Sequence, residues 1–534
     1  MHQLCQTPSL SSRSPRIQGA RSEWSLLATT ESFALVGTEA RIVQVEVDVD
    51  SGIPGFSIVG LPARSVREAE QRTRSAINAT SGERWPRERI VANLAPGALR
   101  KEGTHFDLGI ALGVLAAKGR VSEESLAGWI CLGELALDGE VRRVPGTLAA
   151  AIACQERGRR GVICPAANAA EAELLEAVEV VPVTSLEDCL KFLRTGTKLA
   201  RGPEPPRTAP AHADDLTEVR GQEEAKRALE VAAAGGHNLL LEGPPGSGKT
   251  MLARRLPGIF PTMSLQESLE ITRIRSVDGL LDEAAGLVAC RPFRSPHHHV
   301  SVAGLIGGGP HLARPGEVSL AHLGVLFLDE ISLYRRDVLE SLRAPLEDGV
   351  VRIARSGGVI SYPCRFALIG AMNPCPCGFR GDESRSCDCS GPEVARYRSR
   401  LSGPLLDRFD MQVVMTRLTR KELLGPPEGE DSPTVRRRVE SARAMQVERY
   451  GSSVTTNASA PRGQLDSKLL LDDSARANLG AAIDALSLSG RGVDRVLRVA
   501  RTVADLEGSD VITQQHLFSA LSFRLLPSDE QVAA

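Results

Sequence analysis

The chain has 534 residues, of which 42% are hydrophobic and 24% charged, so it has the composition of a globular protein and the length of more than one domain. Its formal net charge of −2 excludes a general positive field, so a polyanionic partner would have to bind at local basic patches. No apolar run is long enough to span a bilayer and no hydrophobic signal core opens the chain, so we expect a cytoplasmic protein without membrane contact.

The composition and periodicity of the first 194 residues predict a disordered tail followed by an α/β domain. Residues 1–28 are rich in Ser, Arg and Gln and show no periodicity, which is typical of a tail. Within 29–194, strand-like runs alternate with helix-like runs. The predicted strands are 42–49, 56–59, 90–94 and 161–164, and the predicted helices are 63–78, 106–118 and 147–157.

A second and a third domain follow a linker. Residues 195–215 are rich in proline and predict no regular structure. We therefore place an α/β core at 216–425. The last domain, 426–534, begins with loop-like sequence around one helix at 435–449 and continues into amphipathic helices at 469–523.

A phosphate-binding loop follows the apolar run 239–241. The sequence 243–250 fits G-x-x-x-x-G-K-[ST] at every fixed position. Glycines allow backbone N–H groups to surround a polyphosphate, a lysine reaches the β- and γ-phosphates, and a hydroxyl ligates Mg²⁺. These residues predict ATP and Mg²⁺ binding: Gly243, Pro244, Pro245, Gly246, Ser247, Gly248, Lys249 and Thr250.

Hydrolysis also needs a carboxylate for the metal and a base for the water. The apolar run 325–328 ends in Asp329 and Glu330, and we assign the metal to Asp329 and the water to Glu330. By itself this pattern also fits a strand followed by a helix cap. Its place downstream of Lys249 favours the catalytic interpretation.

Three further residues are candidates for contact with the nucleotide. Asn373 ends the apolar run 366–369 and would lie beside the γ-phosphate, although it also fits a turn. Arg408 lies in a turn and could reach the γ-phosphate of a neighbouring subunit as an arginine finger, although it also fits a surface Arg–Asp pair. Arg491 opens a helix that also carries Arg495 and Arg498, and this helix equally fits a solvated face.

Two runs around a Ser-Gly-Gly turn at 347–363 predict a β-hairpin. Its Arg352 and Arg355 could follow a phosphate backbone without reading bases. An aromatic content of 4% also argues against extensive base stacking. Further candidates for phosphate contact are Arg396, Arg398, Arg400 and the cluster 436–438, although charge clusters are more often solvated faces.

Seven of the eleven cysteines are scattered singly, which favours reduced thiols over a disulfide framework. The other four form two C-x-C pairs, Cys375 with Cys377 and Cys387 with Cys389. Four thiolates satisfy tetrahedral Zn²⁺, but the usual spacing is C-x₂₋₄-C, so a zinc site and four reduced loop thiols both stay open. The three histidines 297–299 fit polar loop residues better than metal ligands.

The order of these motifs resembles that of an AAA+ ATPase of the magnesium-chelatase-like group. Longer strings resemble its ComM/YifB branch, among them Arg-Pro-Phe-Arg-Ser-Pro-His-His-His at 291–299, Met-Asn-Pro-Cys-Pro-Cys-Gly at 372–378, and the segments 219–222, 304–309, 315–322 and 400–408. Segments 93–96, 99–103 and 106–108 of the first domain resemble it too. The resemblance implies an α/β chain with a Lon-like, S5-like N-terminal α/β domain, an AAA+ P-loop core and a C-terminal helical lid.

The likeness of the first domain to the Lon protease raises the question of peptidase activity. Lon-type hydrolysis uses a Ser nucleophile with a Lys base. Here His105 stands where the Ser is expected and Leu148 near the Lys position, so we expect a binding platform or a role in hexamer assembly.

The family implies a homo-hexameric, ATP-dependent DNA translocase or branch-migration helicase linked to recombination or natural transformation. Two alternatives stay open. One is a magnesium-chelatase-type motor that remodels a metal-insertion partner, although such subunits ordinarily lack the first domain. The other is an ATP-gated scaffold without motor activity.

Overall fold

The computed structural model describes residues 26–198, 214–281, 286–309, 314–355, 358–382, 385–425, 429–466 and 469–524. They divide into two compact units. The described parts of 1–32, 43–142 and 183–198 form the first, and those of 33–42, 143–182 and 199–534 form the second. Most of the predicted tail and linker lies outside the described residues. No described helix has the length and apolar character needed to cross a membrane.

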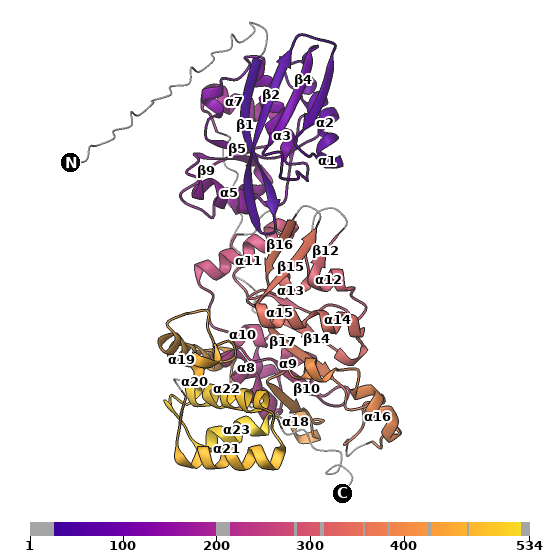
Figure 1. Cartoon of the computed structure of the whole chain (residues 1–534), viewed down its shortest axis with the longest axis vertical. Coiled ribbons are helices and arrows are strands. Elements are labelled where there is room, and N and C mark those ends of the chain that lie inside the picture. Colours follow the sequence, from indigo (N-terminus) through magenta and orange to yellow (C-terminus); the bar gives the residue numbers. More distant parts are fainter. Residues whose placement is uncertain are drawn as a thin grey trace, which may run out of the picture. The chain divides into compact units, whose positions relative to one another are not determined.

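The N-terminal part of the chain builds a seven-stranded mixed sheet of order β3-β4-β2-β1-β5-β8-β9 (Figure 1). β4 pairs with β2 in antiparallel and with β3 in parallel. Its strands are β1 (Leu26–Val36), β2 (Glu39–Asp50), β3 (Gly55–Val59), β4 (Arg89–Ala95), β5 (Trp129–Cys131), β8 (Gly161–Pro165) and β9 (Glu179–Val183). A separate hairpin pairs β6 (Glu134–Leu135) with β7 (Val141–Arg142).

The four predicted strands and three predicted helices of this part are all present. The helices are α1 (Arg64–Arg67), α2 (Ala69–Ala79), α3 (Phe106–Ala117), α4 (Glu123–Leu126), α5 (Thr147–Glu156), α6 (Ala169–Ala172) and α7 (Leu186–Thr195). Every residue of α3 is buried, which explains why its sequence is apolar except for Asp107, whose carboxylate pairs with Arg72 at 2.6 Å. The predicted 63–78 helix is divided at Glu68 into α1 and α2.

Strand β1 was not predicted, and it begins inside the segment that the sequence indicates as a tail. Its inward-facing positions include Thr30 and Ser32, which are 2% and 0% exposed. The Thr30 hydroxyl donates a hydrogen bond to the Gly109 carbonyl oxygen at 2.9 Å. Because hydroxyl side chains occupy buried positions, the alternation of apolar and polar residues that marks a half-buried strand is missing.

The second unit contains a five-stranded sheet of order β11-β14-β17-β10-β18, in which every neighbouring pair is parallel. The strands are β10 (Leu239–Glu242), β11 (Phe293–Arg294), β14 (Val325–Leu328), β17 (Ala367–Met372) and β18 (Met411–Val414). Leu239 and Leu241 belong to one buried core and Leu240 to another, so both faces of the sheet are covered. This burial explains the continuous apolar runs in the sequence.

Helices of 4 to 14 residues and two hairpins belong to the same unit as this sheet (Figure 1). The helices are α8 (Glu223–Gly235), α9 (Lys249–Arg254), α10 (Leu256–Ile259), α11 (Leu265–Asp278), α12 (Val302–Ile306), α13 (Glu317–Leu320), α14 (Arg336–Ser341), α15 (Arg343–Asp348), α16 (Gly391–Arg398), α17 (Gly403–Leu406) and α18 (Arg420–Leu424). The hairpins pair β12 (Gly307–Gly308) with β13 (Arg314–Pro315) and β15 (Val350–Arg355) with β16 (Gly358–Pro363).

The C-terminal part is helical, and Figure 1 shows its helices gathered in ochre and yellow. They are α19 (Ser432–Tyr450), α20 (Arg462–Asp466), α21 (Asp473–Leu486), α22 (Gly490–Leu506) and α23 (Gln514–Ser522), with a short pair of β19 (Leu470–Leu471) and β20 (Val511–Ile512). Helix α22 packs against α23, α19 and α8. Its Arg495 and Arg498 are each 8% exposed, so the solvated face considered for this helix is wrong.

Candidate nucleotide-binding and catalytic site

The loop between β10 and α9 forms an open cradle of backbone. Gly246 and Gly248 have φ values of +80° and +93°, which L side chains rarely adopt. A Cβ added at either position would meet no atom within 4 Å, so the space above the loop is open. The buried hydroxyl of Ser247 has no hydrogen-bond partner among the described residues. An open loop of backbone with an unpartnered hydroxyl fits a polyphosphate.

Lys249 is folded back onto this loop. Its Nζ donates hydrogen bonds to the carbonyl oxygens of Gly243 at 2.6 Å and Pro244 at 3.0 Å, and to Oδ1 of Asn373 at 3.2 Å. Burial lowers the pKa of Lys249, and the nearby carboxylates of Asp329, Glu330 and Glu242 oppose this shift. The ammonium group is therefore held at the loop and oriented by neutral oxygens that a phosphate could replace.

Thr250 and Asp329 form a hydroxyl–carboxylate pair beside the lysine. Thr250 Oγ1 donates to Asp329 Oδ2 at 2.8 Å, and the backbone N–H of Glu330 donates to Asp329 Oδ1 at 3.0 Å. These oxygens are of the type that Mg²⁺ prefers. Glu330 is exposed and has the left-handed conformation, with φ 48° and ψ 47°, which turns the chain sharply at the end of β14.

Parallel register brings these side chains together. Leu328 of β14 lies opposite Gly370 of β17, and Met372 of β17 lies opposite Glu242 of β10. Asn373 follows β17 directly, so it emerges at the same edge of the sheet as the phosphate loop and Asp329. The structure thus unites Lys249, Thr250, Asp329 and Asn373, which the sequence indicated from separate motifs.

Arg408 lies elsewhere, in a cluster of positive charge. Its guanidinium pairs with the Glu347 carboxylate, while its Nε is buried without a partner. Burial, together with the nearby cations Arg491, Arg495 and Arg343, lowers the pKa of Arg408. Among the described contacts, neither Arg408 nor the exposed Arg491 is hydrogen-bonded or ion-paired to the phosphate loop of its own chain.

The β15–β16 hairpin forms as predicted, with antiparallel pairs from Val350↔Pro363 to Arg355↔Gly358. The Arg352 side chain is 61% exposed and pairs with Asp348 at 2.8 Å. The turn at 356–357 and the side chain of Arg355 lie outside the described residues.

Three family models match separate parts of the chain. The family model "Magnesium chelatase, subunit ChlI" matches residues 215–423, "Subunit ChlI of Mg-chelatase" matches 45–168, and "Magnesium chelatase, subunit ChlI C-terminal" matches 429–524. The chain is 44% identical to protein Rv2897c of Mycobacterium tuberculosis, over 92% of this chain and 97% of that protein. It is 41% identical to the competence protein ComM of Haemophilus influenzae, over 94% and 98%, and 40% identical to YifB of Escherichia coli, over 94% and 97%.

The chain belongs to the ComM/YifB branch of the magnesium-chelatase-like family. It is a ComM-type AAA+ protein, and this membership implies an ATPase that uses ATP with Mg²⁺.

The contacts that Gln222 and Arg398 make around the site of this ComM-type protein were not predicted from the sequence. Gln222 Nε2 donates to the Thr416 carbonyl oxygen at 2.6 Å and to that of Ser247 at 3.4 Å, which links the loop to the chain after β18. Arg398 pairs with the buried carboxylate of Glu242 at 2.8 Å. Glu242 ends an apolar strand directly before the loop, and this position indicates that its carboxylate has a partner. The sequence does not identify that partner, because Arg398 lies far along the chain.

Two other arginines considered for phosphate contact, Arg436 and Arg438, are bound to groups of the same chain. Arg436 donates to the Gly258 carbonyl oxygen at 2.9 Å through Nε, and Arg438 pairs with Glu230 and Glu430, each at 2.6 Å. Like the pair of Arg398 with Glu242, these contacts hold elements together. Arg396, Arg400 and Arg437 are exposed, as is Arg352, so these four arginines stay candidates for phosphate contact.

The four paired cysteines converge. Their ligand atoms lie within 4.8 Å of one another, as do those of the three histidines 297–299. The cysteines are partly or fully buried, whereas His297 and His299 are exposed, as expected for polar loop residues.

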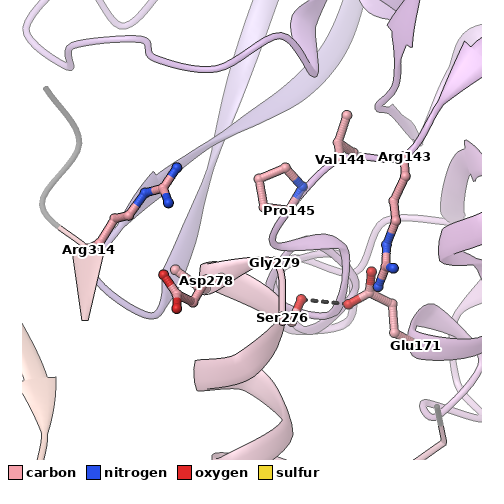
Figure 2. A pocket seen from close by; sticks show the side chains of 9 residues that line it. Arg143, Val144, Pro145, Glu171, Ser276, Asp278, Gly279 and Arg314 are labelled. Carbon is pink, nitrogen blue, oxygen red and sulfur yellow. Dashed lines mark hydrogen bonds between the residues drawn. The ribbon is translucent and has the colours of Figure 1, made fainter. Parts of the chain in front are cut away.

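The second unit also contains a pocket of about 280 Å³, and none of the residues that line it is a predicted site residue (Figure 2). Arg143, Glu171, Ser276, Asp278 and Arg314 contribute its polar side chains. Ser276 Oγ donates to Glu171 at 2.6 Å, and burial raises the pKa of Glu171. Because Ser276 and Glu171 are hydrogen-bonded to each other, and Arg143 and Arg314 lie near the carboxylates of Glu171 and Asp278, we regard the pocket as a packing feature.

Proposed function

We propose that this chain is an ATP-driven, homo-hexameric DNA motor, a branch-migration helicase or translocase of the ComM type. The observation that carries the proposal is the convergence of Lys249, Asn373 and the Thr250–Asp329 pair at the edge of one parallel sheet. The name of the Haemophilus influenzae relative, competence protein ComM, and the exposed Arg352 support the DNA-directed part.

Each residue at the sheet edge has a task in hydrolysis. Lys249 exchanges its carbonyl partners for phosphate oxygens, and Asn373 orients the attacking water. Glu330 accepts a proton as the water oxygen bonds to the γ-phosphorus and the bond to the β-phosphate oxygen breaks, releasing ADP. Thr250 and Asp329 would hold the Mg²⁺ that accompanies the nucleotide, and this ion neutralises charge on the phosphates.

The arginine cluster acts in a neighbouring subunit. Among the contacts of the described residues, none joins Arg408 to the phosphate loop of its own chain, and like charges surround it, so it is suited to meet an anion across a subunit interface. Arg491 lies in the same cluster and contacts the same anion. This arrangement requires a ring in which each subunit completes the site of the next.

DNA binds through the β15–β16 hairpin. Arg352 contacts backbone phosphates, and Arg355 of the same strand is a second candidate. The first domain acts as a platform rather than a peptidase. In support of this role, His105 and Leu148, which stand where Lon proteases carry Ser and Lys, are 2% and 0% exposed.

The proposal is tested by ATP hydrolysis with and without branched DNA, using the unmodified chain, Glu330→Gln and Arg352→Ala. We expect DNA to raise turnover in the unmodified chain, no turnover in Glu330→Gln, and basal turnover without stimulation in Arg352→Ala. Arg64→Ala is a matched control, because Arg64 is also an exposed arginine in an (i, i+4) ion pair. Turnover that is unaffected by DNA would favour a chelatase-type motor, and binding without turnover a scaffold.

A further inference from the structure

The cysteine turn between β17 and α16 brings four sulfur atoms together. The Sγ atoms of Cys375 and Cys377 lie 3.3 Å apart, those of Cys375 and Cys387 3.6 Å, and those of Cys377 and Cys387 3.5 Å. All four Sγ atoms, including that of Cys389, lie within 4.8 Å of one another, and none forms a disulfide. Nine residues separate the two pairs in sequence, so this convergence is made by the fold.

These distances match the geometry of a tetrathiolate metal site. Zn–S bonds of about 2.3 Å in a tetrahedron place the sulfur ligands about 3.8 Å apart. The backbone also supports the thiolates: the N–H of Cys377 donates to the Sγ of Cys389 at 3.4 Å, and the N–H of Phe379 donates to that of Cys377. Donors of this kind orient ligands and tune the charge of a bound metal.

The turn is in direct contact with the nucleotide site. A Cβ added at Gly378 would lie 2.7 Å from Pro245 Cδ in the phosphate loop and 3.8 Å from Asn373 Cγ. Asn373 precedes the first cysteine by two residues. After the last cysteine, α16 begins at Gly391 and carries Arg398 to the buried Glu242. The four cysteines are therefore placed to fix Asn373, Pro245 and Arg398 relative to one another.

We propose that Cys375, Cys377, Cys387 and Cys389 bind one Zn²⁺, and that this ion holds the turn that positions Asn373 against the phosphate loop. Zinc has no redox role here and contacts no substrate. The four cysteines are positioning residues for the nucleotide site, and this second half of the proposal rests on the proposed ATPase function.

Metal content tests the first half. We expect the full chain, purified under reducing conditions without added metal, to contain one zinc per chain by plasma mass spectrometry. Co²⁺ in its place should give the charge-transfer and d–d absorption bands of a tetrahedral thiolate site. Cys377→Ser should lose the metal, Cys389→His should keep it as a Cys₃His site, and Cys290→Ser, at a half-buried lone thiol, should be unchanged.

A chain that contains no zinc, takes up neither Zn²⁺ nor Co²⁺, and shows all four thiols free to a thiol reagent would overturn the proposal. So would retention of one zinc by folded Cys377→Ser, with the fold checked by circular dichroism. Because metal binding is measured without nucleotide, these outcomes do not depend on the proposed ATPase function.

The positioning half is tested by removing zinc from the unmodified chain with a chelator and measuring ATP affinity and turnover. We expect kcat to fall about tenfold or more, the effect typical of disturbed supporting contacts, and to recover when Zn²⁺ is restored. A zinc-free chain with unchanged kcat and ATP affinity would show that the metal does not position the site. An unmodified chain that binds zinc but has no ATPase activity would instead contradict the proposed function.

Discussion

The Lys249 side chain is held at the phosphate loop by hydrogen bonds within the chain. Its ammonium group is buried but is satisfied by two loop carbonyls and by Asn373, so the cation is kept at the loop without a fixed counter-ion. Three carboxylates nearby favour the charged form, and burial works against it. Because burial is the larger effect, the lysine loses its proton more easily than an exposed lysine.

This balance predicts a pH dependence of ATP binding. The folded-state pKa of Lys249 is lowered, and phosphate binding requires the cation, so ATP affinity should fall as the pH rises through that pKa, below the usual 10.5. The fall should be about tenfold per pH unit above the pKa, because each binding event then takes up one proton. Calorimetric titration with ATP between pH 8 and pH 10 measures this.

Lys249→Met should bind weakly at every pH, with a flat profile. The stability of the free protein changes with pH in the opposite direction to ATP affinity. Over this pH range the unfolded chain keeps the Lys249 proton that the folded chain has lost. Lys249 thus makes the free energy of unfolding rise with pH over the same range. An equal decline of affinity in both proteins would assign the dependence to another group.

At the scale of elements, the C-terminal helices are held together by buried ion pairs as well as by apolar packing. The Asp505 side chain of α22 is fully buried and accepts hydrogen bonds from Arg449 of α19 at 2.6 Å and from Arg501 of α22 at 3.0 Å. Asn457 Nδ2 donates to the same carboxylate at 2.7 Å. The carboxylate therefore joins two helices and the segment that connects them.

Asp505→Ala should lower the free energy of unfolding of this helical part by about 3–5 kcal/mol, because two buried guanidinium groups lose their counter-charge. Denaturant titration followed by circular dichroism measures the change, and Asp484→Ala at an exposed position of α21 is the control. A loss below about 1 kcal/mol, similar to that of a surface pair, would contradict the bridging role.

The sequence predicted the elements that carry the site better than the contacts between them. Strands β10, β14 and β17 were found because burial on both faces leaves continuous apolar runs, and the phosphate loop was found because its glycines are fixed in position. Strand β1 was missed because Thr30 and Ser32 face inward. The burial of Arg495 and Arg498 was missed because their partners, Asp407 and carbonyl groups near Asn457, lie far away along the chain.

At the scale of the whole molecule, the proposed ring divides one active site between two chains. Lys249 and Thr250 of the phosphate loop lie beside the Asp329 carboxylate of the same chain. Arg408 of that chain pairs instead with Glu347. Arg408→Ala should therefore keep ATP affinity and lose about a thousandfold in turnover, the effect of removing an arginine finger.

A mixing experiment tests the division directly. Lys249→Ala supplies an intact Arg408 and Arg408→Ala supplies an intact phosphate loop, so mixed rings should recover turnover that neither variant shows alone. Mixing Arg408→Ala with the double variant Lys249→Ala/Arg408→Ala should recover none. Equal activity in the two mixtures would place Arg408 in the site of its own chain.

The left-handed backbone of Glu330 implies that the residue best suited to hydrolysis lowers the stability of the fold. A residue with a side chain at φ 48° costs about 1–2 kcal/mol relative to the right-handed conformation, whereas glycine adopts it freely. Glu330→Gly should therefore be more heat-resistant than Glu330→Ala by about 1 kcal/mol in unfolding free energy, although both are inactive. In the proposed role, Glu330 therefore supplies the carboxylate needed for turnover at a position where glycine would give the more stable fold.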